Sequence, residues 1–498
     1  MGGNLGDLFE AAATATPGAT ALVVDGERWT FAQLDDRVNR LAEVLALQGI
    51  AREDRVGILL GNTNEHLEVL LACFKLRALA VNLNTRLVAG ELAELLSLSQ
   101  ADVVVHEPDL GDLLPSHVTG ISRGPGYEAA LAAADPTPPD PAGGRSGDDL
   151  YVLYTGGTTG RPKGVLWRHD DLRVAALAGD LGLGARRVLV ACPLFHGTGQ
   201  WMALAAVLAG GTVLTTRARS VEPERVWGLA EAERATHLVL VGDAYARPLV
   251  EALELRPGRW RLDDLTVVLS GGAQLSPDVT SRLLAALPCA MVVDGYGATE
   301  TGGHARLVSV AGSPTTTTSA FRVGDDTAVL DDQLRPIPRG EPTEGWLARR
   351  GPLPLGYDGD PEATAQTFPV VDGVRWSVPG DRARWLDAHR VEILGRGALT
   401  INTGGEKVHA EEVEGVLRDH PAVADAIVVG APDERWGELI TAVVTAVPGA
   451  TVTLDDLVEH CRGVLAPFKA PRRLVLVDEV RRSASGKPDY RWARGLAE

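Results

Sequence analysis

Apolar runs of four to six residues alternate along the chain with longer segments in which apolar residues recur at helical spacing. The spacing from Phe31 to Leu47 predicts a helix, and Arg55 to Leu60 is typical of a buried strand. This alternation continues from Leu8 to about His106. It predicts an α/β fold in which helices cover sheets.

Several predicted strands lead into segments that contain glycines or hydroxyl residues, as strands do where a ligand site opens. These runs span 150–154, 186–195, 237–241, 266–270 and 291–293. The second ends at His196-Gly-Thr-Gly199, before a helix predicted from Gln200 to Leu208. Because strand ends that open side by side form a crevice, we expect the runs at 266–270 and 291–293 to hold a flat ring.

Two segments lack a clear pattern. Residues 122–148 are rich in Pro, Gly, Asp and Ala. They predict a long surface loop, with a domain boundary as the alternative. Residues 309–332, which include Thr315 to Thr318, predict a surface loop or a small subdomain.

The last hundred residues show a separate α+β pattern. We expect a helix from Ala410, strands near 424–429 and 439–447, and a helix from Leu454 that Thr453 caps. A segment of this size folds as a domain of its own. We therefore predict a large domain over 1–395 and a small domain over 396–498.

Composition narrows the function classes. The 498 residues exceed what one hydrophobic core usually supports. The net charge of −18 argues against nucleic acid or an anionic membrane as the main partner. No 18-residue apolar span exists, so we expect no integral membrane segment. The four cysteines lie far apart, without a disulfide or metal-ligand pattern, which favours a reduced, cytoplasmic setting.

The segment YTGGTTGRPKGV, residues 154–165, carries the strongest signal for chemistry. Its glycines allow a backbone to approach an anion, and its hydroxyls and lysine add donors and a positive charge. These residues are Thr155, Gly156, Gly157, Thr158, Thr159, Gly160 and Lys163. They predict a phosphate-binding loop rather than a polar turn. The spacing differs from that of the common mononucleotide loop, Gly-x-x-x-x-Gly-Lys-[Ser/Thr].

This segment resembles the phosphate loop of the adenylate-forming superfamily, which includes acyl-CoA synthetases, luciferases and peptide-synthetase adenylation domains. GYGATET at 295–301, WSVPGD at 376–381, Gly395-Arg396-Gly397 and Ser485-Gly-Lys487 follow in the family's order, with Pro379 in place of the threonine that the family has before Gly-Asp. The likeness runs from about Thr30 to Trp492. It implies a large multi-sheet layered α/β N-terminal domain and a smaller mobile α+β C-terminal domain.

The resemblance also implies the nucleotide site. Tyr296 would stack on adenine, Thr299 would contact the α-phosphate, and Glu300 would bind Mg²⁺, which prefers carboxylate oxygens. Asp381 and Arg396 would bind the ribose, and Lys487 would be the mobile catalytic lysine. The purine would be lined by Gly271, Gly272, Ala273, Asp294, Gly295, Gly297 and Ala298.

By the same resemblance, an acyl pocket and a hinge follow. The pocket would be lined by His196, Gly197, Gly199, Trp201, Asp243, Ala244, Gly271, Gly295 and Gly297. His196 is equally well interpreted as a structural residue. The hinge and the coenzyme A tunnel would be formed by Gly397, Ala398, Gly404 and Gly405. Ala398 departs from the family, which usually has Asp or Lys there, and this leaves the balance between two domain orientations open.

The implied reaction has two halves. ATP and Mg²⁺ activate a carboxylic acid to an acyl-adenylate with release of pyrophosphate, and coenzyme A then forms the thioester. The catalytic residues would be Lys487, Thr299, Glu300 and His196. The absence of an acid near Phe195 argues against an amino acid, unless Asp243 substitutes, and favours a hydrophobic substrate. A fatty, aryl, polycyclic or terpenoid acid remains open.

Two alternatives remain at this point. The first is an adenylating enzyme that hands its product to an acyl carrier protein or to a separate thioesterifying enzyme, with Ala398 as its only support. The second is a nucleotide- or acyl-binding protein without turnover. The presence of Lys487, Glu300, Asp381 and the phosphate loop together argues against the second. The resemblance is also compatible with a homodimer.

Overall fold

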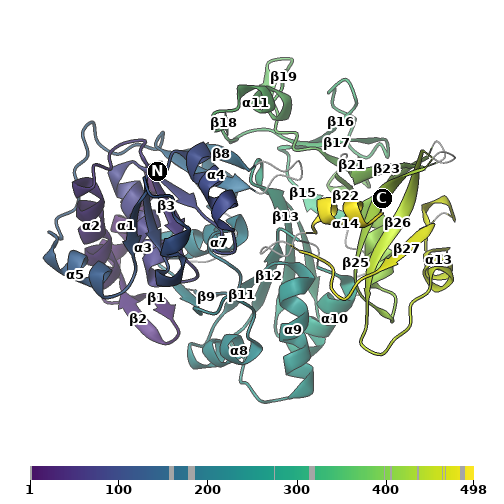
Figure 1. Ribbon diagram of the computed structural model, residues 1–498, viewed down its shortest axis with the longest axis horizontal. Coiled ribbons are helices and arrows are strands. Elements are labelled where there is room, and N and C mark those ends of the chain that lie inside the picture. The colour runs from purple at the N-terminus through teal and green to yellow at the C-terminus, as the bar shows by residue number, and fades with distance from the viewer. Residues whose placement is uncertain are drawn as a thin grey trace.

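The computed structural model describes residues 3–155, 162–177, 186–273, 275–312, 320–396, 399–403, 406–433, 437–462, 464–465, 467–482 and 488–497. Helices and strands alternate through the first half, as predicted, and a smaller α+β unit ends the chain (Figure 1). The predicted fold class is therefore confirmed.

The helices are α1 (Leu5–Ala15), α2 (Phe31–Leu47), α3 (Asn64–Leu76), α4 (Ala89–Ser99), η1 (Pro108–Leu113), α5 (Pro125–Ala133), α6 (His169–Leu172), the π-helix η2 (Arg173–Leu177), α7 (Gly197–Leu208), α8 (Pro223–Ala232), α9 (Gly242–Leu255), α10 (Pro277–Ala286), α11 (Pro361–Thr367), α12 (Ala410–Arg418), α13 (Leu454–Arg462), η4 (Pro467–Lys469) and α14 (Tyr490–Ala497). The strands are β1 (Thr20–Val24), β2 (Glu27–Thr30), β3 (Arg55–Leu59), β4 (Leu79–Asn82), β5 (Val103–His106), β6 (Thr119–Ser122), β7 (Leu150–Thr155), β8 (Lys163–Arg168), β9 (Arg187–Val190), β10 (Thr212–Thr215), β11 (His237–Leu240), β12 (Val267–Gly271), β13 (Met291–Ala298), β14 (Gly302–Val310), β15 (Ala320–Val323), β16 (Thr327–Leu330), β17 (Glu344–Arg349), β18 (Gly356–Tyr357), β19 (Val370–Val371), β20 (Val374–Arg375), β21 (Asp381–Trp385), β22 (Arg390–Arg396), β23 (Thr400–Thr403), β24 (Glu406–His409), β25 (Val423–Asp433), β26 (Gly437–Ala446) and β27 (Arg473–Leu476).

One long sheet crosses the large domain, with strand order β16-β17-β21-β22-β15-β14-β13-β12-β11-β9-β10-β1-β2. From β13 to β1 neighbouring strands are parallel, whereas from β13 to β16 they are antiparallel. Strand direction therefore changes between β13 and β14. Parallel sheets place ligand sites beyond the carboxyl ends of their strands, so this junction is where a site is expected.

Two further sheets complete the N-terminal half. One is parallel, with order β4-β3-β5-β6, and the other is antiparallel, with order β18-β8-β7. Every residue of α3 is buried. This helix therefore lies within the core, which explains why its sequence shows no single apolar face.

The helix predicted from Phe31 to Leu47 is confirmed as α2. It begins where Thr30 and Gln33 form a reciprocal capping box, which satisfies two backbone N–H groups at the helix start. The helix α7 begins at Gly197, three residues before the predicted start at Gln200.

The loop predicted over 122–148 is wrong in part, because α5 forms within it. Proline occupies its first position, and Tyr127 and Leu131 are buried four residues apart on one face. A proline start and one apolar stripe are enough for a short helix packed on the core. In the segment 309–332, β15 and β16 form, and residues 313–319 lie outside the described residues.

The small domain has a sheet with order β24-β23-β26-β25, and β27 pairs with β26. Its helices α12 and α13 and its strands follow the predicted pattern, and Thr453 caps α13 through Asp456. Each hydrophobic cluster of the described residues lies wholly before residue 394 or wholly after residue 398. Among the described helices, none is long and apolar enough to cross a bilayer.

Candidate active site

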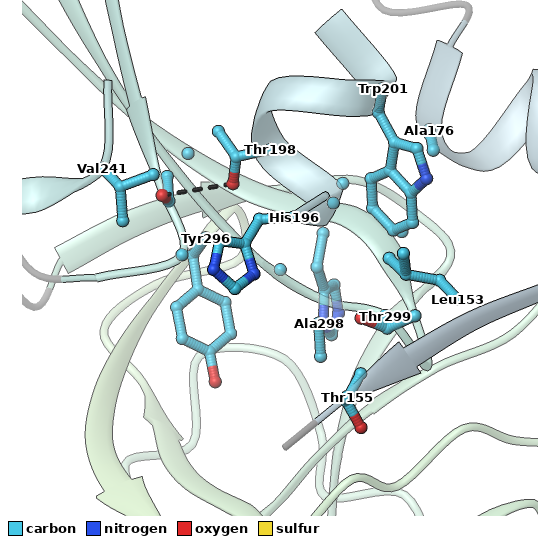
Figure 2. A pocket seen from close by; sticks show the side chains of 18 of the residues that line it. Leu153, Thr155, Ala176, His196, Thr198, Trp201, Val241, Tyr296, Ala298 and Thr299 are labelled. Carbon is cyan, nitrogen blue, oxygen red and sulfur yellow. Dashed lines mark hydrogen bonds between the residues drawn. The ribbon is translucent and has the colours of Figure 1, made fainter. Parts of the chain in front are cut away.

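A cavity of about 1600 Å³ opens where the parallel and antiparallel halves of the long sheet meet. Its walls come from β7, α7, β12, β13 and β14, and residues of the small domain line it as well. Figure 2 shows side chains from these elements and from residues next to them around a common space, with His196, Trp201, Tyr296 and Thr299 among them.

The phosphate loop connects two antiparallel strands. Thr155 at the end of β7 lies opposite Lys163 at the start of β8, and Thr155 and Pro162 line the cavity. The Lys163 ammonium lies 4.9 Å from the centre of the Tyr357 ring. The predicted loop residues Gly156, Gly157, Thr158, Thr159 and Gly160 lie outside the described residues.

The backbone of Thr299 and Glu300 is fixed by buried donors from distant parts of the chain. Trp167 Nε1 donates to the Thr299 carbonyl at 3.0 Å, and Ser377 Oγ donates to the Glu300 carbonyl at 2.7 Å. Trp167 and Ser377 are fully buried. The Tyr357 hydroxyl donates to Glu300 Oε1 at 2.8 Å. The predicted phosphate and metal residues are thereby held in one orientation.

Arg349 extends this backbone support. Its Nη1 donates to the carbonyl oxygens of Thr301, Gly303 and Ala175, the last of which belongs to η2. Its Nε donates to Asp326 at 2.7 Å, which gives the buried guanidinium a counter-ion. One side chain therefore joins the segment after Glu300 to η2, which packs against it.

Most of the residues predicted to line the purine lie at the cavity. Gly271, Gly272, Gly295, Tyr296, Gly297 and Ala298 line the cavity, and the Tyr296 ring packs 5.6 Å from the ring of Phe321. Ala273 and Asp294 are not among the lining residues. Burial, together with the nearby Asp243 carboxylate, raises the pKa of Asp294 well above its ordinary value.

One wall of the cavity is formed by residues 195–198 together with Trp201 (Figure 2). His196 is the residue before α7, and its ring packs 4.6 Å from the ring of Phe195. Thr198 Oγ1 donates to the Gly271 carbonyl at 3.2 Å, which ties α7 to β12. The structure therefore brings the predicted acyl residues His196, Gly197 and Trp201 beside the predicted purine residues.

Three other predicted acyl residues do not line the cavity. Gly199 is buried, and a Cβ there would lie 2.5 Å from the Pro193 carbonyl oxygen, so its small size serves packing. Asp243 accepts hydrogen bonds from Ser276 and Arg247, and Ala244 lies beside it in α9.

The two residues predicted to bind the ribose are paired on neighbouring strands. Asp381, at the start of β21, lies directly opposite Arg396 at the end of β22, and Asp381 is buried. The hinge and tunnel residues Gly397, Ala398, Gly404 and Gly405 lie outside the described residues.

Lys487 also lies outside the described residues, but both ends of its segment are at the cavity. Arg482 and Pro488 line the wall, as do Arg481 and Tyr490. Arg482 is held by a pair of hydrogen bonds to Asp425, at 2.5 and 2.6 Å. The small domain thus places the described residues on both sides of the segment 483–487 at the cavity.

Sequence reasoning missed Trp167, Ser377, Arg349 and Tyr357. Ser377 lies four residues before Asp381, in a segment already singled out, so the sequence could have identified it. The other three lie on β8, β17 and β18 and contact the segment 299–303 from far away in sequence, so no local pattern identifies these contacts.

Comparison with known families gives two matches. A family described as AMP-binding enzyme matches residues 9–357, and one described as AMP-binding enzyme C-terminal domain matches residues 412–487. The chain is 40% identical to the medium-chain acyl-CoA ligase Mig of Mycobacterium avium, over 98% of this chain and 97% of the relative. It is 39% identical to a 3-oxocholest-4-en-26-oate–CoA ligase of Rhodococcus rhodochrous, over 99% and 95%.

Solved structures agree in fold. ATP-bound MatB from Rhodopseudomonas palustris has a TM-score of 0.86 at 27% identity and covers 99% of each chain. A fatty acyl CoA synthetase of Mycobacterium tuberculosis has a TM-score of 0.75 at 28% identity, over 99% of this chain and 98% of that one.

Proposed function

The chain belongs to the AMP-binding enzyme family, within the adenylate-forming superfamily, and we propose that its own substrate is a hydrophobic medium-chain, long-chain or polycyclic carboxylic acid. The protein is an AMP-forming acid–thiol ligase. It converts the acid and ATP to an acyl-adenylate and pyrophosphate, and then coenzyme A and the acyl-adenylate to an acyl-CoA and AMP. The cavity that combines Thr155, Tyr296 and Thr299 with the apolar wall at Trp201 supports this assignment most directly.

The choice of a hydrophobic acid rests on the lining and on the relatives. Leu153, Val174, Leu177, Trp201 and Met202 line the side of the cavity formed by β7, η2 and α7. Apolar pockets take apolar ligands, and a few polar groups fix the orientation. The two ligases compared above are named for medium-chain acyl groups and for 3-oxocholest-4-en-26-oate, and both kinds of acid fit such a lining.

In the first half-reaction, a carboxylate oxygen attacks the α-phosphorus and the bond to pyrophosphate breaks. Two anions must approach each other, so positive charge at this point lowers the barrier. We assign this role to Lys487, because both described ends of its segment line the cavity. Thr299 would contact the α-phosphate, and Lys163 would face the departing pyrophosphate. His196 would lie at the mouth of the acyl pocket.

The site fits Mg²⁺ if the ion shares its coordination with the nucleotide. Glu300 offers one carboxylate, and the described residues contain no cluster of three ligating side chains that could hold an ion without phosphate oxygens. Mg²⁺ typically takes one or two carboxylates together with phosphate oxygens and water. When bound there, the ion would neutralise charge on the departing pyrophosphate.

Replacing Glu300 by glutamine is expected to raise the Mg²⁺ concentration needed for half-maximal adenylation by about tenfold, because one charged ligand is lost while the hydrogen bond to Tyr357 remains. The measurement is pyrophosphate exchange into ATP over a Mg²⁺ titration. Tyr357→Phe is the control, since it keeps the carboxylate. An unchanged Mg²⁺ requirement in the glutamine variant removes Glu300 from the metal site.

We place the domain boundary between residues 395 and 396, and we propose that the small domain turns there between the two half-reactions. The separation of the hydrophobic clusters on either side of residues 394–398 supports a division at this point. The hinge would include Arg396 and Ala398, and Gly404 and Gly405 would line the coenzyme A tunnel.

The experiment that tests the function is exchange of labelled pyrophosphate into ATP over a panel of fatty, aryl and sterol acids, with acyl-CoA measured in parallel. We expect exchange with fatty or sterol acids and acyl-CoA after coenzyme A is added. Exchange without acyl-CoA would favour transfer to a carrier protein or a separate thioesterifying enzyme. Failure of every hydrophobic acid, with exchange on a small polar acid, would overturn the substrate class.

A further inference from the structure

Trp201 belongs to a buried chain of side-chain hydrogen bonds beside the cavity. Its Nε1 donates to the Tyr151 hydroxyl at 3.0 Å, and that hydroxyl donates to Gln200 Oε1. Gln200 Nε2 in turn donates to Asn82 Oδ1 at 2.9 Å and to the Leu194 carbonyl at 3.3 Å. The chain therefore runs from α7 to β7, returns to α7 at Gln200 and ends on β4.

The directions of these bonds are fixed by the groups themselves. The Trp201 indole can only donate, so the Tyr151 hydroxyl must accept there and use its single proton toward Gln200. Both protons of the Gln200 amide are then used on Asn82 and Leu194. A chain with one consistent direction holds its members in one arrangement, and each bond strengthens in the low dielectric of the interior.

Burial of these side chains restrains the Trp201 indole in this orientation. Tyr151 is 1% exposed and Gln200 is fully buried, and neither lines the cavity. Trp201 is 9% exposed and does line it. An indole that rotated away from Tyr151 would leave a buried N–H without a partner, which costs more than the hydrogen bond itself contributes.

The neighbours of Trp201 show that it forms a wall rather than a flexible cover. A Cβ added at Gly197 would lie 3.2 Å from Leu153 and 3.8 Å from the Trp201 indole. Leu153 follows Tyr151 by two residues, so both side chains lie on the same face of β7. Strand β7 thus supplies both an apolar contact at the wall, Leu153, which Figure 2 shows near Trp201, and the hydroxyl that fixes the indole.

We propose that Trp201 is a fixed wall that limits the width of the acyl group, and that Tyr151 is the positioning residue that holds it there. The proposal deepens the function assigned above and rests on it. It implies that the protein prefers an unbranched chain to a flat fused-ring acid of similar carbon number. Gln200 also holds Leu194, so the wall and the loop that carries His196 share one support.

The test compares decanoate with 2-naphthylacetate, by calorimetric binding and by pyrophosphate exchange. Tyr151→Phe removes the hydroxyl but keeps the ring. We expect it to lower the preference for decanoate about fivefold, the size expected for losing one hydrogen bond that restrains the indole. The change should appear in the dissociation constants of the acids and leave the KM for ATP unchanged. Trp201→Phe, which lacks the N–H group, should lower the preference at least as much.

Tyr127→Phe is the matched control. Tyr127 is also buried and its hydroxyl also donates to a buried side chain, Glu68, but it does not line the cavity. Its loss should reduce stability without changing the preference. In the double variant Tyr151→Phe/Trp201→Phe, the effect should not exceed that of Trp201→Phe alone, because both changes act on the indole.

Three results would overturn the proposal: an unchanged preference in Tyr151→Phe, an unchanged preference in Trp201→Phe, or an equal change in Tyr127→Phe. Calorimetric binding does not depend on turnover. If the protein binds the acids with the expected preference but shows no exchange, the result would contradict the catalytic function. The same result would still support the proposal that Trp201 is a fixed wall.

Discussion

Replacing Lys487 by alanine is expected to slow acyl-adenylate formation by about a thousandfold. One positive charge at 4 Å from the reacting anions, at an effective dielectric of about 20, contributes roughly 4 kcal/mol, which is about three powers of ten in rate. The measurement is carboxylate-dependent pyrophosphate exchange at saturating ATP and acid.

A second reaction separates this role from a general loss of structure. If Lys487 acts only in adenylation, the alanine variant should still convert added acyl-adenylate and coenzyme A to acyl-CoA at close to the normal rate. Lys469→Ala is the control, because Lys469 is also in the small domain but pairs with Glu412 and does not line the cavity. Full exchange activity in the Lys487 variant would show that another group supplies the charge.

Replacing Arg349 by methionine is expected to lower the free energy of unfolding of the large domain by about 3 kcal/mol, because a buried charged donor is lost and several carbonyls remain unpaired. Methionine fills much of the same space, so the effect comes from the lost hydrogen bonds. The exchange rate should fall at least tenfold, since the backbone around Thr301 and Gly303 loses its anchor. Chemical denaturation and exchange kinetics measure the two effects.

Arg339→Met is the matched control for Arg349. Arg339 also donates to three backbone carbonyls, those of Ala388, Gly324 and Thr327, but it is partly exposed and does not line the cavity. Its loss should cost less stability and leave exchange unchanged. Equal loss of exchange in both variants would mean that Arg349 acts only through overall stability.

The sequence predicts those parts of the fold that depend on local pattern. The helix from Phe31 to Leu47 follows from apolar spacing, and the strands at β12 and β13 follow from apolar runs that end in glycines. The helix α5 was missed because glycines, prolines and acidic residues surround it and its only large apolar side chains are Tyr127 and Leu131, whose burial depends on the neighbouring α2.

At the site, the contiguous motifs could be predicted from the sequence. The distant side chains that hold the backbone of these motifs in place could not. Tyr296, Thr299 and Glu300 stand in one short segment whose residue types match their chemistry. Trp167 and Arg349 reach that segment only because β8 and β17 pass near it in the folded chain. Both side chains donate to main-chain oxygens. Every residue has such an oxygen, so the residue types in the sequence do not show which one a distant donor will reach.

The attachment of η2 through a main-chain oxygen has a consequence for protein engineering. Arg349 holds the Ala175 carbonyl and needs no particular side chain on that helix. The side chains at Val174, Ala176 and Leu177 line the cavity, yet none of them carries the link to the segment after Glu300. A library that varies these three positions can therefore reshape the substrate range while the catalytic backbone stays anchored.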